Sequence, residues 1–250
     1  MRALALLLLV APLALVACGG GTSSSSELNL SPTAYVKQAA QKSSAASSMH
    51  MKLKGSVTVP GGQSVVLSGD GAFTKHEGSF RLDFNAGGLG GSIDAVIQSA
   101  QLYVRSPLFA DGLPKGKTWL KLDLSKQASA QGLDLTKLAA QDPAQTLARL
   151  QSLGNVQEVG TEQVDGVDTT HYRGRLAQTA GASAGPFDVW VGKDDGYVRR
   201  VQFATGAAAS TASARLTMDL SDFGKDVTIT VPSAAETADA TTLNIPGLGG

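Results

Sequence analysis

The chain has 250 residues, of which 42% are hydrophobic and only 5% aromatic, and its 21 Lys and Arg balance 21 Asp and Glu. This interspersed, balanced charge excludes the basic domain or patch that electrostatic binding of nucleic acid requires. The single cysteine, Cys18, lies near the N-terminus, so the sequence predicts neither a disulfide nor a Cys-based metal site in the folded part.

The N-terminus has the pattern of an export signal. Met1–Arg2 is followed by the apolar run Ala3–Val16, which is shorter than the roughly 20 residues needed to span a bilayer. The closing sequence Leu15-Val16-Ala17-Cys18 resembles a bacterial lipobox, in which cleavage falls between Ala17 and Cys18 and the cysteine receives lipid. The alternative is an ordinary secretory signal with an incidental cysteine. We therefore expect residues 1–17 to be a lipoprotein signal peptide.

Residues 18–31 are predicted to form the lipidated cysteine and a flexible Gly/Ser tether, because Gly19–Ser26 contains only Gly, Ser and Thr. Two or more acyl chains hold a protein firmly on a membrane. The expected location is therefore extracytoplasmic, on the outer face of the cell membrane, with Cys18 as the anchor.

Three helices are predicted. Ser31 is a favoured N-cap and Pro32 a favoured first helical residue, which predicts a helix from about residue 32 to 46. Leu133–Ala140 is a short candidate, and Asp142-Pro143 begins a third helix, whose leucines recur at helical spacing up to Gly154.

Elsewhere the apolar residues recur with a period of two, which indicates half-buried strands. A Gly-rich loop is predicted over Ala86–Gly91, and two-residue or short Asp-Gly turns after Val164 and Lys193 predict hairpins. The predicted strands are His50–Val59, Ser64–Thr74, Ser79–Asn85, Ser92–Ser99, Gln101–Arg105, Thr118–Leu124, Val156–Val164, Val167–Leu176, Phe187–Lys193, Tyr197–Thr205, Ala214–Leu220 and Val227–Val231.

These elements predict an α+β fold that is mainly antiparallel β. About ten or eleven of these strands, joined mostly by short turns, are expected to form one sheet, which curls strongly at this size, and the few helices cover its concave face. We expect this domain to occupy residues 32–232, followed by a loose C-terminal tail over 233–250, which is rich in Ala, Thr, Gly and Pro.

Three features that suggest chemistry have simpler explanations. Gly181–Gly185 matches the GxSxG pattern around Ser183, but it lies in an Ala/Gly/Ser loop before a strand, and all three histidines precede the serine. His50, His76 and His171 lack metal-ligand spacing, and Asp194-Asp195 suits a hairpin turn. We predict no catalytic residue, no metal and no cofactor, and hence a protein that is not an enzyme.

One charged cluster leaves two interpretations open. Lys115, Lys117 and Lys121 lie close to Trp119 along the chain and could contact membrane headgroups or an anionic ligand. The alternative is a solvated strand face.

Four segments, in this order and spacing, resemble the actinobacterial LppX/LprG lipoproteins, which are related in fold to the LolA/LolB lipoprotein carriers. They are Pro114–Leu122, Val164–Tyr172, Val189–Gly196 and Leu220–Val227. The resemblance implies an incomplete, strongly curved β-barrel with helices across its mouth and an apolar cavity that carries lipids or lipid-anchored molecules.

The resemblance makes the inward-facing apolar residues the functional candidates. A lipid pocket and an ordinary core have the same composition, so both readings stay open. The leading hypothesis is a monomeric, membrane-anchored protein that binds or transfers a lipid or glycolipid, and the alternative is a cargo-free sensor or interaction module. The candidate lining residues are Phe80, Leu82, Phe84, Leu120, Leu122, Leu147, Leu150, Val201 and Phe203.

Overall fold

A computed structural model describes residues 30–58, 62–124, 143–151, 154–175, 186–205 and 213–243. The predicted signal peptide, almost all of the tether, the predicted helix Leu133–Ala140 and the Gly181–Gly185 motif lie outside these residues. The expectations about them therefore remain predictions.

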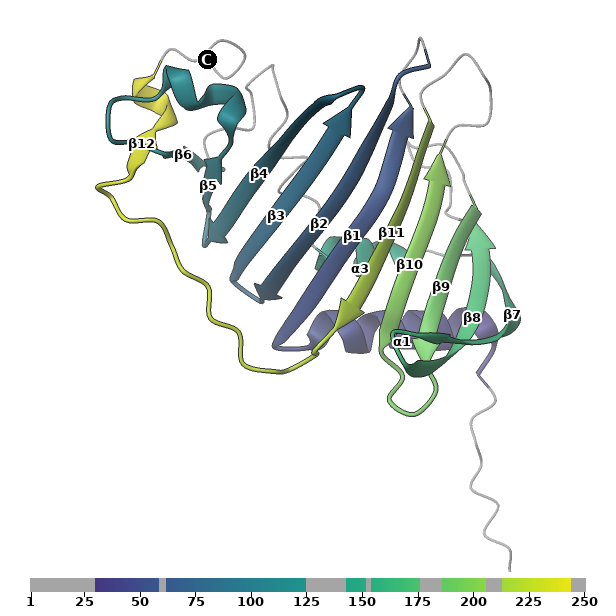
Figure 1. Cartoon of the computed structure of the whole chain (residues 1–250). Helices are drawn as coiled ribbons and strands as arrows, with labels where there is room; N and C mark the ends of the chain where they lie inside the picture. Colours follow the sequence, from purple (N-terminus) through teal and green to yellow (C-terminus); the bar gives the residue numbers. More distant parts are fainter. Residues whose placement is uncertain are drawn as a thin grey trace, which may run out of the picture.

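A single twelve-stranded sheet forms the body of the protein, in the order β12-β6-β5-β4-β3-β2-β1-β11-β10-β9-β8-β7 (Figure 1). All neighbouring strands are antiparallel except β12, which runs parallel to β6. The strands are β1 (Ser48–Thr58), β2 (Ser64–Thr74), β3 (Glu77–Ala86), β4 (Leu89–Gln98), β5 (Gln101–Arg105), β6 (Trp119–Asp123), β7 (Gly154–Val164), β8 (Val167–Arg175), β9 (Pro186–Gly192), β10 (Val198–Thr205), β11 (Ser213–Ser221) and β12 (Thr237–Asp239).

The mainly antiparallel, curled sheet confirms the predicted fold class. Hairpin connections link β1 through β5. Pairing between β1 and β11 joins the strands β1 to β6 to the strands β7 to β11. The turn between β7 and β8 is Asp165-Gly166, and both residues have positive φ, as a two-residue hairpin turn requires. The predicted Gly-rich loop is shorter than expected, because only Gly87 and Gly88 make the turn and β4 begins at Leu89.

Two α-helices cover one end of the concave, inner face. In α1 (Pro32–Ala45), the Ser31 side chain caps the helix by accepting a hydrogen bond from the Ala34 backbone N–H. Its buried stripe, Val36, Ala39 and Ala40, packs with Leu147 and Leu150 of α3 (Pro143–Leu150) in the main core cluster. Both helices lie behind the sheet in Figure 1, where α1 crosses the lower ends of β8 to β11.

A second core cluster lies at the other end of the sheet. Leu102, Val104, Leu120 and Leu122 of β5 and β6 are almost completely buried, and Ala240 of the short 3-10 helix η2 (Ala240–Thr242) packs against them. Another 3-10 helix, η1 (Pro107–Gly112), joins β5 to β6, and its Phe109 also contacts this cluster.

The C-terminal region differs from the sequence expectation in two ways. Val227–Val231 alternates apolar and polar residues but forms no strand; it is part of an extended connection that runs beneath the lower ends of β1 to β5 (Figure 1). This connection leads to β12, whose residues Thr237–Asp239 pair with β6 in a region where a loose tail was expected. A three-residue parallel strand has too few residues for a period-two pattern, which explains why the sequence did not predict it.

Among the helices in the described residues, none is both long enough and apolar enough to cross a membrane.

Candidate functional site

All nine candidate lining residues lie on the inner face or on the helix that covers it. Leu82, Leu147, Leu150 and Val201 belong to the main core cluster, and Leu120 and Leu122 belong to the second one. The three phenylalanines, Phe80, Phe84 and Phe203, are only half-buried. The structure therefore divides the candidates into six close-packed residues and three with accessible surface, while their role as cavity lining remains a proposal.

Glycines on the inner face of β1 to β4 hold large side chains flat against the sheet. A Cβ on Gly69 or Gly71 would lie 2.3 or 2.6 Å from the Phe80 ring, and one on Gly91 would lie 2.5 Å from the Phe84 ring. Packing of this kind fills the space above a glycine without a side chain that stands upright into the interior. The glycines also permit strong local bending of the strands.

The upper part of the inner face is apolar and half-exposed. These side chains lie near the strand ends opposite α1, where the described helices do not cover the sheet. They are Val57, Val65, Leu67, Phe84, Phe203 and Leu216. Phe80 and Ile93 are also half-buried but lie lower on the inner face, in the cross-strand rows of Met51 and Leu53. A concave apolar surface of this kind is suited to acyl chains, because burial of apolar area drives their binding.

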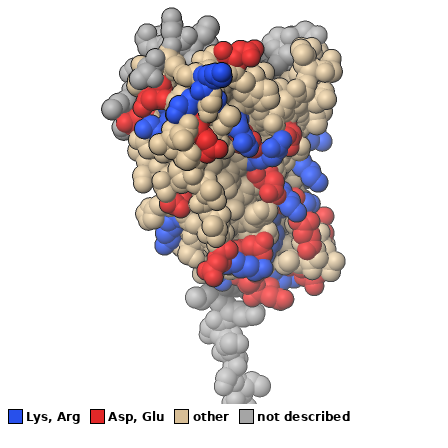
Figure 2. All heavy atoms as spheres, turned by 60° about the vertical axis from the view of Figure 1, so that its left-hand side comes forward, with Lys and Arg blue, Asp and Glu red and all other residues tan. Residues whose placement is uncertain are grey.

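The outer face carries a row of charges that alternate in sign. Cross-strand pairing aligns one residue from each of seven neighbouring strands, in the order Arg200, Asp219, Lys52, Asp70, Arg81, Asp94 and Arg105. Opposite charges on directly opposed residues stabilise an antiparallel pair. Figure 2 shows Lys and Arg interspersed with Asp and Glu on the visible surface, without a large patch of one sign.

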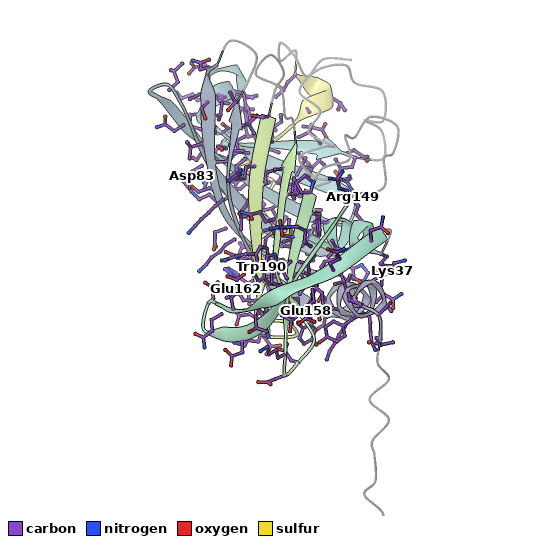
Figure 3. The ribbon with its side chains drawn as sticks, turned by 90° about the vertical axis from the view of Figure 1, so that its right-hand side faces the viewer. Lys37, Asp83, Arg149, Glu158, Glu162 and Trp190 are labelled. Carbon is purple, nitrogen blue, oxygen red and sulfur yellow. The ribbon has the colours of Figure 1, made fainter. Side chains whose placement is uncertain are left out.

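Next to this row, an aromatic and ionic cluster joins β7, β8 and β9. The His171 ring stacks on Trp190 with centroids 4.2 Å apart, and its Nε2 lies 2.7 Å from Asp188 Oδ1. The indole N–H of Trp190 donates to the Glu162 carboxylate. In Figure 3, Trp190 and Glu162 lie on the side of the sheet away from α1. Trp190 is the cross-strand partner of Arg200, the residue at one end of the charged row.

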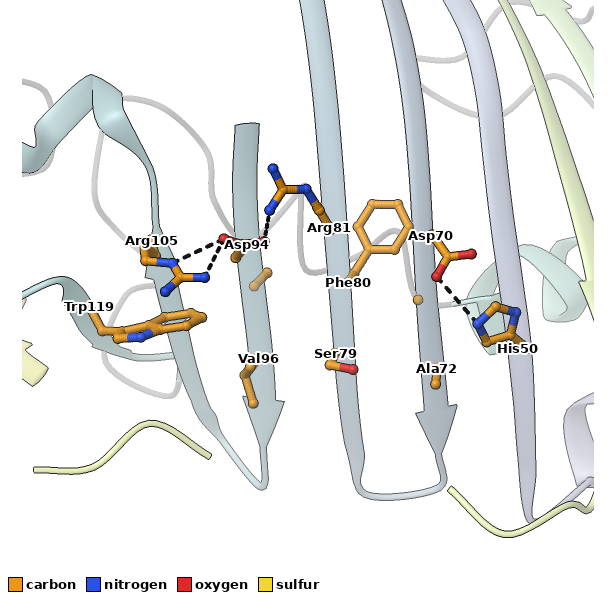
Figure 4. A pocket seen from close by; sticks show the side chains of 12 residues that line it. His50, Asp70, Ala72, Ser79, Phe80, Arg81, Asp94, Val96, Arg105 and Trp119 are labelled. Atoms are coloured by element: carbon orange, nitrogen blue, oxygen red, sulfur yellow. Dashed lines mark hydrogen bonds and ion pairs between the residues drawn. The ribbon is translucent and has the colours of Figure 1, made fainter. Parts of the chain in front are cut away.

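A groove of about 390 Å³ lies on the outer face of β1 to β6 (Figure 4). Its floor consists of the cross-strand partners Ala72, Ser79 and Val96. Arg105 and Trp119 lie at one end, His50 and Asp70 at the other, and Arg81 and Asp94 along one side.

The ionic groups of the groove hold one another in place. Asp94 accepts hydrogen bonds from Arg81 Nη1 at 3.2 Å and from Arg105 Nη2 at 2.9 Å. The Arg105 guanidinium also lies over the Trp119 ring, 4.8 Å from its centroid. At the other end, His50 Nε2 lies 3.4 Å from Asp70 Oδ1.

The groove brings Trp119 together with Arg105, a residue that the sequence analysis did not identify as a candidate. Arg105 contacts Trp119, whereas Lys117 donates to the carbonyls of Ala234 and Ala235, and Lys121 lies 3.6 Å from Asp239. Sequence spacing drew attention to the lysines because they are near Trp119 in the chain, but Arg105 reaches it across the β5–β6 ladder.

The histidines and Asp194-Asp195 are the remaining residues that the sequence suggested for chemistry. Within the described ranges, no group of three His, Cys, Asp or Glu side chains is arranged to hold a metal ion. Asp195 shapes the β9–β10 turn by accepting from the Tyr197 backbone N–H, which agrees with the turn interpretation of Asp194-Asp195.

Comparison with known proteins supports this fold, although no family model matches the chain. An uncharacterised 31.2 kDa protein of Streptomyces griseus is 27% identical over 84% of this chain and 79% of its own length. A Streptomyces coelicolor protein that is named as a lipoprotein, SCO4650, is 32% identical over 50% of this chain and 43% of its own length. The crystal structure of LprF from Mycobacterium bovis superposes with a TM-score of 0.51 at 13% identity, covering 81% of this chain and 97% of LprF. The resemblance to the LppX/LprG lipoproteins is thus confirmed at the level of the fold: this chain has the fold of LprF.

Proposed function

We propose that this protein is a membrane-anchored lipoprotein that binds a lipid or lipid-anchored cargo on its inner face, without catalysing a reaction. The observation that carries the proposal is the half-exposed apolar surface on the concave side of β1 to β4, β10 and β11. The rings of Phe80 and Phe84 pack onto glycines of the neighbouring strands on this face. Each buried CH₂ of an acyl chain contributes about 0.8 kcal/mol, so one chain seated here gains substantial affinity.

The lipobox supports anchoring through Cys18. A relative named as a lipoprotein agrees with this, and it favours an extracytoplasmic location on the cell membrane. The full chain should fractionate with membranes and show the mass of an acylated Cys18. Cys18→Ala should abolish the mass increase and release the protein from the membrane fraction, whereas an unmodified wild-type cysteine would contradict the proposal.

Lipid binding can be tested with two neighbouring residues that point to opposite faces of β2. Leu67 lies on the inner face and packs against the core, whereas Val66 lies on the outer face and is 57% exposed. The full chain, purified in mild detergent, should retain lipid in native mass spectrometry and take up a fluorescent acyl lipid from vesicles. Leu67→Lys should abolish uptake because it places an ammonium group on the apolar surface.

The matched control is Val66→Lys, which adds the same charge on the opposite face and should leave uptake unchanged. Equal uptake by wild type and Leu67→Lys would argue against a cargo site on the inner face. A wild-type chain free of lipid and unable to take it up would favour the interaction-module hypothesis instead.

A further inference from the structure

The outer groove is separate from the proposed lipid surface, because the sheet itself lies between them. Its lining side chains Asp70, Ala72, Ser79, Arg81 and Asp94 alternate along the strands with the inward-facing residues. Phe80 of β3 also borders the groove, but no residue of α1 or α3 lines it. The groove needs an explanation of its own.

The groove presents donors and acceptors in nearly equal numbers. The positive charges of Arg81 and Arg105 are balanced by Asp94 and Asp70, so the lining attracts neither an anion nor a cation strongly. Both guanidiniums are accessible, with side-chain exposures of 54% and 49%. A ligand that both donates and accepts hydrogen bonds suits such a lining better than a phosphate or a carboxylate does.

Each arginine is held in place yet keeps donor capacity. Arg105 uses Nε and Nη2 on Asp94, and Arg81 uses Nε on Asp83 and Nη1 on Asp94. A guanidinium carries five N–H donors, so Nη1 of Arg105 and Nη2 of Arg81 can still donate. Because the existing bonds fix both side chains, a ligand would not bear the full entropic cost of ordering them.

The shape of the groove limits the class of ligand. Its floor of small residues runs across β2, β3 and β4 and ends at His50 and Tyr103, their partners in the same cross-strand row. The span from β1 to β4 is three strand spacings, or about 14 Å. The floor is shallow and contains no deep apolar pocket for the aromatic or aliphatic anchor on which peptide interfaces depend. At one end, Trp119 supplies an indole with an N–H donor and an apolar ring, one face of which is covered by the Arg105 guanidinium.

We propose that this groove binds a neutral oligosaccharide, with two or three sugar units lying across β1 to β4. Sugar hydroxyls donate to Asp70 and Asp94 and accept from Arg81 and Arg105, while the C–H faces of the rings contact Ala72, Val96 and the end formed by Trp119. This binding is independent of lipid uptake and uses the opposite face of the sheet.

The test uses the full chain in a detergent without a sugar headgroup, titrated calorimetrically with maltohexaose, cellohexaose, mannohexaose and chitohexaose. At least one of these neutral hexasaccharides should bind, and its affinity should change little with salt because neither partner carries net charge. Trp119→Ala and Ala72→Phe should each weaken binding at least about tenfold, the first by removing the indole and the second by filling the floor.

Arg81→Gln and Arg200→Gln form the matched pair. Both remove an arginine from the same charged row, but only Arg81 lines the groove, so only Arg81→Gln should weaken binding. Ala72→Phe alters a half-buried position on the outer face and tests the groove even if Trp119→Ala does not fold. The proposal is overturned if no hexasaccharide binds at about 5 mM, a concentration that detects even millimolar affinity, if Ala72→Phe binds as well as wild type, or if only charged ligands or peptides occupy the groove.

Discussion

At the scale of single residues, the inner-face glycines are the positions where one methyl group matters most. A Cβ on Gly71 would lie 2.6 Å from both the Phe80 ring and the Ser79 carbonyl oxygen, so backbone as well as side chain must move. Gly71→Ala should lower the free energy of unfolding by about 1–3 kcal/mol, the usual cost of overpacking. Urea denaturation of wild type and Gly71→Ala measures this difference in the free energy of unfolding.

Gly160→Ala is the control for this substitution. A Cβ at Gly160 of β7 meets nothing within 4 Å, so this variant should unfold like wild type. If both variants were equally stable, the close packing of Phe80 on Gly71 would not be a constraint on the fold.

Tyr172 should titrate unusually late. Burial, followed by the nearby Tyr35 and Glu158, raises its pKa from the ordinary 10.0 to about 12. The unfolded chain loses this proton near pH 10 but the folded chain holds it to about pH 12, so its stabilising contribution is complete below pH 10 and is lost as the pH rises through 12. Ultraviolet titration of phenolate should show a late phase that Tyr172→Phe removes.

Tyr35→Phe provides a second check, because Tyr35 is one cause of the shift. The rings of Tyr35 and Tyr172 lie 5.7 Å apart. In this variant the late phase should persist but move to lower pH. A late phase that survives in Tyr172→Phe would show that another group is responsible.

At the scale of elements, the alternating row of charges supports the register of the sheet. If one strand slipped by one residue, its charged residue in this row would move onto the apolar face of the sheet. Asp94→Lys would place three cations side by side on β3, β4 and β5. Since like charges on opposed residues destabilise each pair by up to about 1 kcal/mol, we expect a loss of roughly 1–2 kcal/mol.

This loss should shrink in about 0.5 M salt, because screening weakens the repulsion between exposed charges. Asp111→Lys is the matched control, since it makes the same change in η1, outside the row of strands. Equal effects of the two substitutions at low salt would mean that the row contributes only general surface charge.

At the scale of the whole molecule, the C-terminal segment completes the second core. Ala238 and Ala240 are buried beside the β5–β6 leucines, although the segment is far from them in the chain. A chain that ends at Val231 should expose this cluster, melt at lower temperature and bind a hydrophobic dye such as ANS. A chain that ends at Leu243 keeps β12 and η2 and should melt like the full chain, and identical behaviour of the two truncations would contradict a structural role for β12.

The sequence by itself determined the strand segments from β1 to β11 and the cap of α1, because periodicity, capping and turn chemistry act between near neighbours. It also indicated which residues face inward. It did not predict β12, and it assigned Val227–Val231 to a strand, because alternation along a segment does not reveal whether a partner strand lies beside it. Tertiary structure alone decided that phenylalanine rings lie on glycines of the neighbouring strand, that Arg105 rather than a nearby lysine covers Trp119, and that the charges of seven strands align in one row. Each of these three features depends on strand order and register, which bring together residues that are far apart in the chain.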